Sequence, residues 1–340
     1  MAETTAIEWT RGDDGTPGAT WNPVTGCTKI SPGCDRCYAE TFAERWRGVP
    51  GHHFENGFDI QTRPDRLTLP LRWKKPRRVF LDSMFDLFHS DISDGYIARV
   101  WDVMARCPQH TFLILTKRPG RMRSWVQRWA SREGDHRVSP DALPQGPEAV
   151  RATYTSGRSH LFADMLDDMG EPPQGCAYPL YDWMEGPRWW PGVLPNVWLG
   201  ASVEDQKWAD IRIPALLETP AAVRFLSAEP LLGEINLRQA VIPMGSERGH
   251  GLTASYVHGS GCCDRFHGID WVIVGGESGR RSRPMDLQWA SQLVTQCRDA
   301  SVPVFVKQLG SAFGPRKGAD MATWPLNLRV REFPTGAVAP

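Results

Sequence analysis

The sequence predicts an α/β fold, specifically a partial or full TIM-like (β/α) barrel that carries two irregular insertions. Three observations predict it: about seven short apolar runs, helical patterns between nearly all of them, and a polar residue after almost every run. Continuously apolar strands are typical of parallel sheets, which are covered on both faces. A doubly wound open sheet is the alternative, because counting strands does not show closure.

The first half of the chain repeats a strand–helix pattern. Strands are predicted over 19–25, 79–81 and 110–115, and helices over 31–46, 94–104 and from about 119 onward. In the second of these helices, which Asp94 is expected to cap, apolar residues recur at the spacing of one buried face. The stretch 48–68 is expected to be irregular.

Two insertions interrupt the second half. A proline-rich insertion or lid is predicted over 130–192, and an insertion containing Gly, Cys and His over 232–268. Strands are predicted over 197–202, 223–227, 271–276 and 302–307, with helices over 205–217 and 287–300. All of these elements are assigned to a single domain spanning 1–340.

Composition excludes several classes of protein. Lys plus Arg and Asp plus Glu are equal at 39 each, so only local basic patches are available to attract nucleic acid. The apolar runs are too short to cross a membrane. The first eleven residues contain no signal-peptide core, and with 8 Cys in 340 residues we expect a reducing, cytoplasmic location rather than disulfides. No phosphate-binding glycine motif of a nucleotide hydrolase is present.

Three cysteines, Cys27, Cys34 and Cys37, lie within eleven residues with the spacing C-x6-C-x2-C. Ser31 is a suitable N-cap for the helix that follows, which would place Cys34 and Cys37 on one face. Three thiolates can hold a [4Fe–4S] cluster and leave one iron free for a ligand. A zinc site completed by a distant His or Cys is the main alternative, and unrelated buried cysteines are another.

Polar side chains follow strand after strand. In both candidate architectures ligands bind beyond the carboxyl ends of the strands, so we expect these side chains to meet there. For any one of them, a solvated loop position is the alternative. The set comprises Cys27, Asp82, Ser83, Thr116, Lys117, Arg118, Ser202, Glu204, Glu229, Glu277, Ser278, Lys307 and Gln308.

Five segments resemble a phage and prophage family known as the three-cysteine-motif proteins, whose members mostly have no assigned function. They are TWNPVTGC (20–27), LTKRP (115–119), NVWLGASVED (196–205), LSAEPL (226–231) and VIVGGESG (272–279). That family is similar to the radical S-adenosylmethionine (SAM) superfamily, and within it to spore photoproduct lyase, which repairs a pyrimidine photoproduct in DNA. The usual spacing there is C-x3-C-x2-C, so the first interval of six residues departs from it.

The resemblance implies an iron–sulfur enzyme, a lyase or a nucleic-acid-modifying enzyme, whose reduced cluster cleaves SAM to a 5′-deoxyadenosyl radical that abstracts hydrogen from the substrate. Cys27, Cys34 and Cys37 are then the cluster ligands. Ser202, Glu204, Glu229 and Glu277 are expected to bind SAM, and Lys117, Arg118 and Lys307 the substrate. Tyr38 occupies the place of the lyase's hydrogen-relay tyrosine, with simple packing as the alternative. Implied partners are an electron donor such as flavodoxin or ferredoxin and a separately encoded three-cysteine-motif partner protein.

The rival function is a non-catalytic zinc- or cluster-bearing phage protein that binds nucleic acid. Two basic runs, 72–78 and 117–128, each contain a tryptophan and are candidates for following a phosphate backbone. Solvated surfaces are the alternative for both. In the second insertion, His258, Cys262, Cys263 and His267 lie within ten residues. They are candidates for an accessory metal site, with incidental thiols on a surface loop as the alternative.

Overall fold

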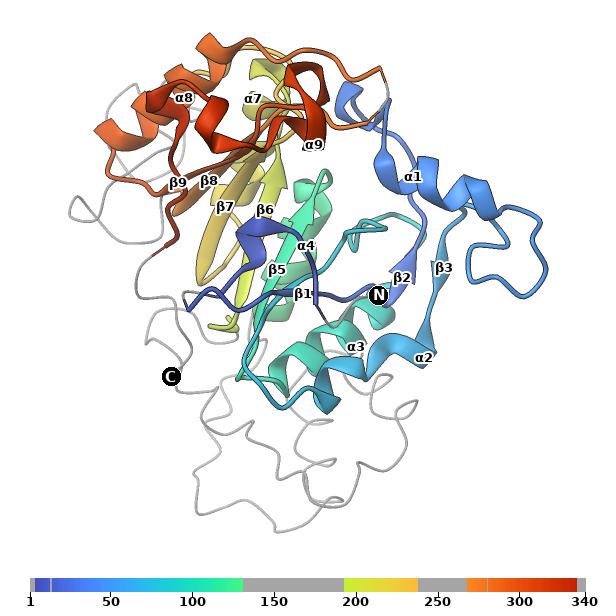
Figure 1. Cartoon of the computed structure of the whole chain (residues 1–340). Helices are drawn as coiled ribbons and strands as arrows, with labels where there is room; N and C mark the ends of the chain where they lie inside the picture. Colours follow the sequence, from blue (N-terminus) through green and yellow to red (C-terminus); the bar gives the residue numbers. More distant parts are fainter. Residues whose placement is uncertain (1–3, 13, 131–192, 238–267, 280, 335–340) are drawn as a thin grey trace, which may run out of the picture.

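The structure is a computed structural model of the chain, and it describes residues 4–12, 14–130, 193–237, 268–279 and 281–334. Seven strands form one sheet in the order β1-β4-β5-β6-β7-β8-β9, and every neighbouring pair is parallel. The sheet is curled into a half-barrel (Figure 1). Its strands are β1 (Ala19–Thr20), β4 (Arg78–Phe80), β5 (Thr111–Thr116), β6 (Val197–Ser202), β7 (Val223–Ala228), β8 (Trp271–Gly275) and β9 (Val304–Gln308).

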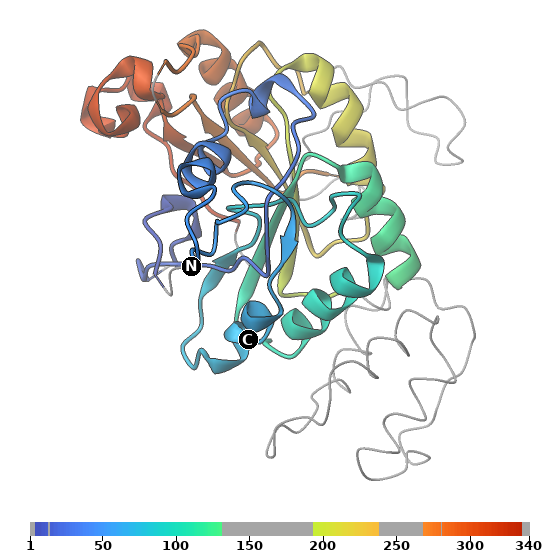
Figure 2. The ribbon, with the colours of Figure 1, turned by 90° about the vertical axis from the view of Figure 1, so that its right-hand side faces the viewer.

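This arrangement confirms the α/β class and is consistent with a partial TIM-like barrel. A doubly wound sheet reverses its strand order at a switch point, whereas this order runs from one edge to the other without reversal. The long helices pack along the outer face of the sheet (Figure 2). They are α3 (Asp94–Ala105), α4 (Pro119–Ala130), α7 (Gln206–Leu217) and α8 (Leu287–Asp299).

The concave face of the sheet is filled with aromatic rings at its amino end. Trp9, on the 3-10 turn η1 (Glu8–Thr10), lies 4.7 Å from the ring of Phe80 and 6.2 Å from that of Trp271. Gly200 is required in this layer, because a Cβ there would lie 2.5 Å from the ring of Phe225. Since side chains alternate along a strand, Ser202 shares this concave face at the carboxyl end. The concave face is therefore filled by apolar side chains at the amino end of the sheet and carries polar side chains at the carboxyl end.

Three predicted elements differ in the structure. The predicted strand 19–25 is two short strands in different sheets, because β2 (Val24–Thr25) pairs antiparallel with β3 (Gln61–Thr62). β3 thus lies within the stretch expected to be irregular. The helix α3 is capped by Ser93, whose Oγ accepts from the Tyr96 amide at 3.2 Å, and Asp94 is its first residue.

Short elements complete the chain. They are η2 (Pro32–Cys34), α1 (Tyr38–Ala43), η3 (Glu44–Trp46), α2 (Pro64–Leu67), η4 (Leu69–Arg72), η7 (Ser311–Phe313), α9 (Pro315–Gly318), η8 (Met321–Thr323) and η9 (Leu326–Leu328). Most of the two predicted insertions, together with His258, Cys262, Cys263 and His267, lies outside the described residues. Across the described ranges, no helix is both long and apolar enough to cross a membrane.

Candidate functional site

The cysteine loop, residues 27–37, lies at the carboxyl end of the sheet, but it does not form the predicted helix. Cys34 ends the 3-10 turn η2, and Cys37 has the extended backbone angles φ −61° and ψ 121° just before α1. The prediction that Cys34 and Cys37 share one helix face is therefore wrong. The reason is visible at Ser31, whose hydroxyl caps no helix and instead donates to Glu204 Oε1 at 2.6 Å.

Glu204 anchors the cysteine loop to the end of β6. Its carboxylate is fully buried, and Oε2 accepts from Arg212 Nη1 at 2.9 Å. The same Arg212 nitrogen donates to the carbonyl oxygen of Ser202 at 2.9 Å. Gly33 lies directly on this carboxylate, since a Cβ there would be 2.4 Å from Glu204 Oε1. The Lys117 ammonium lies 3.8 Å from the same oxygen.

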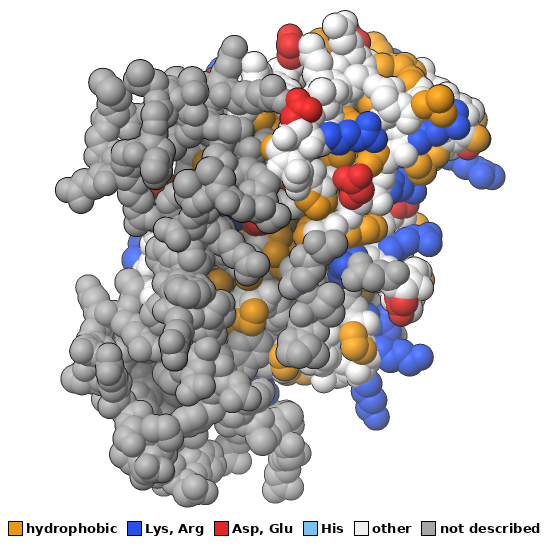
Figure 3. All heavy atoms as spheres, turned by 90° about the vertical axis from the view of Figure 1, so that its left-hand side faces the viewer, with side chains coloured by type: hydrophobic (Ala, Val, Ile, Leu, Met, Phe, Trp, Pro, Cys, Tyr) orange, Lys and Arg blue, Asp and Glu red, His pale blue; other side chains and the backbone are white. Residues whose placement is uncertain are grey.

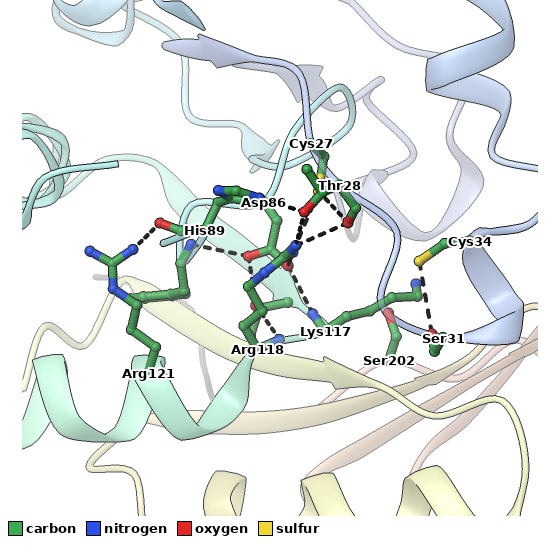
Figure 4. A network of polar contacts seen from close by, with 12 residues as sticks. Cys27, Thr28, Ser31, Cys34, Asp86, His89, Lys117, Arg118, Arg121 and Ser202 are labelled. Carbon is green, nitrogen blue, oxygen red and sulfur yellow. Dashed lines mark hydrogen bonds and ion pairs between the residues drawn. The ribbon is translucent and has the colours of Figure 1, made fainter. Parts of the chain in front are cut away.

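Arg118 joins Cys27 to the end of β5 (Figure 4). Its Nη1 donates to Cys27 Sγ at 3.4 Å and to Asp86 Oδ2 at 3.0 Å. Its Nη2 donates to the carbonyl oxygen of Thr28 at 2.9 Å. Asp86 is buried and is itself fixed by the Thr116 hydroxyl at 2.7 Å. The guanidinium is thus held against the first cysteine by a rigid carboxylate.

The same network extends through the neighbouring loop. The Thr28 hydroxyl lies 2.7 Å from His89 Nε2, and Arg121 donates to the carbonyl oxygen of His89 (Figure 4). Burial lowers the pKa of His89, and the positive charge of Arg118 lowers it further. A neutral imidazole is therefore expected beside the cysteine loop at neutral pH.

The pKa of Cys27 is raised to about 11 by its surroundings. Burial is the largest cause, and the negative charge of Asp86 adds to it, whereas the charge of Arg118 and its hydrogen bond act in the opposite direction. The negative charge of Cys34 raises the pKa slightly further. Ligation by a positively charged metal centre favours the thiolate form of such a cysteine.

Glu277 connects the other side of the cysteine loop to the end of β8. Its carboxylate is buried and accepts from Arg36 Nη1 at 3.2 Å and from the Arg283 backbone amide at 2.7 Å. Burial raises the pKa of Glu277, but the hydrogen bonds and charges of Arg283 and Arg36 outweigh it and lower the pKa below its ordinary value. Arg283 also donates to the carbonyl oxygen of Pro32 at 2.9 Å.

Glu229, Lys307 and Tyr38 complete the polar end of the sheet. Lys307 Nζ lies 2.6 Å from Glu229 Oε1, and both side chains are partly exposed. Tyr38 as a residue is 56% exposed, but its hydroxyl points inward and donates to the carbonyl oxygen of Ser83 at 2.5 Å. Burial of this hydroxyl raises the pKa of Tyr38, and the charges of Cys37 and Glu229 add to the effect.

The donor set at this site consists of three thiols, a ligand type that both zinc sites and iron–sulfur clusters use. Within the residues that the structure describes, no group of three or more His, Cys, Asp or Glu side chains is arranged to hold one metal ion. Three thiolates around one zinc ion must approach within about 4 Å of each other, because Zn–S bonds are about 2.3 Å long. In a [4Fe–4S] cluster each cysteine binds a different iron. Cys27, Cys34 and Cys37 are free thiols of intermediate exposure.

The predicted site residues thus lie at one end of the sheet, on the cysteine loop and at the ends of five strands. The carboxylates of Glu204 and Glu277 contact residues of the cysteine loop, and Arg118 contacts Cys27, so these three also position the loop. Sequence reasoning missed Arg36, Asp86 and Arg283. Asp86 and Arg283 lie several residues beyond a strand, where no periodic signal marks them, and Arg36 stands between two cysteines.

The two basic runs differ in location. The run 72–78 leads into the amino end of β4, so it lies at the opposite end of the sheet from the cysteine loop. In the run 117–128, Arg121 and Arg128 pair with Asp94 at 2.9 and 2.7 Å, and Arg123 pairs with Glu218 at 2.6 Å. Most of these cations are therefore compensated within the protein.

A family model described as protein of unknown function (DUF5131) matches residues 4–325. No curated protein and no solved structure matches the chain.

Proposed function

The chain belongs to the DUF5131 family, and from its site we propose that it is an iron–sulfur enzyme of the radical SAM type that modifies or repairs nucleic acid. The supporting observation is the cysteine loop, which carries three free thiols and is fixed to the polar end of a parallel half-barrel by Glu204, Arg118 and Glu277. In barrel enzymes this end carries the active site.

Cys27, Cys34 and Cys37 would hold a [4Fe–4S] cluster in this proposal. When bound, such a cluster supplies one electron for reductive cleavage of SAM to a 5′-deoxyadenosyl radical. An electron donor such as flavodoxin or ferredoxin and a separately encoded three-cysteine-motif partner protein remain predictions.

The chain's own residues have positioning roles. Ser31 donates to buried Glu204 and Gly33 packs on its carboxylate, so both residues position the cysteine loop. Arg118 directs a positive charge at Cys27 Sγ. Ser202, Glu229 and Lys307 line the polar end beside this loop and are the candidates to bind SAM and substrate. The hydroxyl of Tyr38 keeps its proton and directs it to the Ser83 carbonyl.

Anaerobic purification tests the proposal. We expect a brown protein with about four irons and four sulfides per chain that forms 5′-deoxyadenosine from SAM when reduced with dithionite. Cys27→Ser, Cys34→Ser and Cys37→Ser should each lose iron and activity, whereas Cys297→Ser, at a buried position in α8, should keep both. A colourless protein with one zinc per chain would favour the rival zinc module.

A further inference from the structure

The loop after β9 forms a compact projection at the polar end of the sheet. Gly310, Gly314 and Gly318 all have positive φ, at 102°, 141° and 60°. The loop is closed by the Leu309 amide, which donates to the Gly318 carbonyl at 3.2 Å, and by the Gly310 amide, which donates to the Lys317 carbonyl at 3.0 Å. Backbone contacts within the loop therefore help to fix its conformation.

This loop packs tightly against the loop after β8. The Ser311 amide donates to the Glu277 carbonyl at 2.9 Å, and a Cβ on Gly276 would lie 2.0 Å from the Leu309 carbonyl oxygen. Arg36 of the cysteine loop bonds to both the Glu277 carboxylate and the Arg281 carbonyl. The loop after β8 therefore contacts the cysteine loop, and the loop after β9 packs against the loop after β8.

Cationic and aromatic side chains point outward from these loops. Arg281, Arg316 and Lys317 are exposed and have left-handed backbones with φ of 59°, 53° and 64°. This conformation is unfavourable for residues other than glycine, and such residues concentrate at functional sites. Phe313 is 41% exposed. We call Arg281, Phe313, Arg316 and Lys317 the basic rim.

The charges of the basic rim are not compensated by nearby acids. Within the described residues, the side chains of Arg281, Arg316 and Lys317 form no hydrogen bond or ion pair. The acids around them are engaged, since Glu277 pairs with Arg36 and Arg283, and Asp35 lies 3.6 Å from Arg283. Asp320 accepts from the Ala322 amide at 3.0 Å and keeps its negative charge, which offsets only one of the three cations. The rim is therefore locally positive although the chain is neutral overall.

An uneven charge distribution is also visible on the molecular surface. Figure 3 shows Lys and Arg side chains projecting along one border of the face it draws, with fewer Asp and Glu side chains among them. The net charge of the whole chain is +0, but net charge does not show how cations and anions are distributed over the surface.

We propose that the basic rim binds a single-stranded nucleic acid, with its cations on the phosphates and Phe313 stacked on a base. Cations supply affinity for the backbone, and a base can stack on an exposed ring only when it is unpaired. This inference rests on the proposed nucleic-acid substrate and specifies where that strand binds. It places the strand beside the cysteine loop, where the chemistry is proposed to occur.

The test is binding of a fluorescein-labelled 15-nucleotide single-stranded DNA to the full chain, followed by anisotropy at several salt concentrations. The first variant is Arg316→Asn/Lys317→Asn, because asparagine tolerates left-handed backbones and only the charges are lost. The matched control is Lys74→Asn/Lys75→Asn, which removes two exposed cations at the other end of the sheet. Phe313→Leu tests stacking. Iron and sulfide are measured in every preparation.

We expect the rim variant to bind about 25-fold more weakly in 0.1 M salt and to reduce the slope of log K against log salt by about 1.4, which corresponds to two phosphate contacts. Phe313→Leu should weaken binding about fivefold or more. The control should bind like the wild type.

Equal losses in rim and control variants, or no loss in the rim variants, would overturn the proposal. So would failure of the iron-containing wild type to bind. If the wild type lacks iron but the rim variants still weaken DNA binding as expected, the proposed enzyme is contradicted. Nucleic-acid binding by the basic rim is then still supported.

Discussion

Arg118 Nη1 lies 3.4 Å from Cys27 Sγ, and the same nitrogen lies 3.0 Å from Asp86 Oδ2. The guanidinium cannot swing away freely, because its Nη2 also bonds to Thr28. Arg118, which the sequence assigns to substrate binding, thus makes a fixed contact with Cys27. Hydrogen bonds and positive charge at a cluster's sulfurs raise its reduction potential, since they stabilise the more negative reduced state.

Arg118→Gln should lower the reduction potential of the cluster. Loss of one charge and one hydrogen bond at Cys27 is expected to shift it by about −59 mV, a tenfold change in equilibrium constant for a one-electron couple. Redox titration followed by electron paramagnetic resonance measures the shift. Arg121→Gln is the control, because Arg121 belongs to the same network but contacts His89, Ile92 and Asp94 instead. Equal potentials for wild type and Arg118→Gln would refute the role.

Gly33→Ala should displace the cysteine loop. The new Cβ would lie 2.4 Å from Glu204 Oε1, a buried atom that also binds Ser31. Overpacking of this kind costs about 1–3 kcal/mol, and we expect reduced iron content as well. Gly120→Ala, in α4, meets no atom within 4 Å and should be neutral or slightly stabilising. The free energy of unfolding and the iron content are measured for both variants. Equal values for Gly33→Ala and Gly120→Ala would contradict the positioning role of Gly33.

Arg212→Met should destabilise the fold strongly. It leaves the buried Glu204 carboxylate without its closest cation, and breaking one side of a buried ion pair costs about 3–5 kcal/mol. Arg123→Gln breaks an ion pair of similar length, 2.6 Å, but on the surface, where such a pair contributes at most about 1 kcal/mol. Urea denaturation compares them. A loss from Arg212→Met no larger than that from Arg123→Gln would show that Glu204 does not depend on this partner.

Asp82→Asn should change how stability depends on pH. Burial raises the pKa of Asp82 well above its ordinary value, and the Asp86 charge adds to it. Among the described residues, neither carboxylate oxygen of Asp82 has a hydrogen-bond partner that would stabilise its charged form.

The folded state therefore holds the Asp82 proton more tightly than the unfolded state. Its contribution to stability is complete below about pH 4 and is lost as the pH rises through the raised pKa. Relative to Asp82→Asn, wild type should lose stability progressively as the pH rises above about 4, as measured by urea denaturation. Asparagine suits the φ of 67° at this position. Asp210→Asn, exposed on α7, is the control, and parallel pH profiles for all three proteins would contradict the expectation.

Local patterns predicted the sheet well. Runs such as 111–116 and 197–202 are apolar because both faces of these strands are covered, and each strand ends at the first polar residue. Since the seven strands of the main sheet are parallel, these ends meet at one edge, which is why the sequence predicts that Lys117, Glu204 and Glu229 lie together.

Long-range contacts explain what the sequence did not reveal. Ser31 looked like a helix cap, but its hydroxyl bonds to a residue 173 positions away. Arg36 bonds to Glu277, 241 positions away. No local spacing encodes such pairs, so the break between Cys34 and Cys37 and the positioning role of Glu204 became apparent only in the folded chain.

The most direct measurement is the electron paramagnetic resonance spectrum of the anaerobically purified, reduced protein before and after addition of SAM. With three cysteine ligands and one open iron, we expect a [4Fe–4S]⁺ signal whose g-values shift when SAM binds. The signal should be absent in Cys34→Ser and retained in Cys297→Ser. A wild-type protein with no iron–sulfur signal, or a signal that SAM leaves unchanged, would contradict the proposed function.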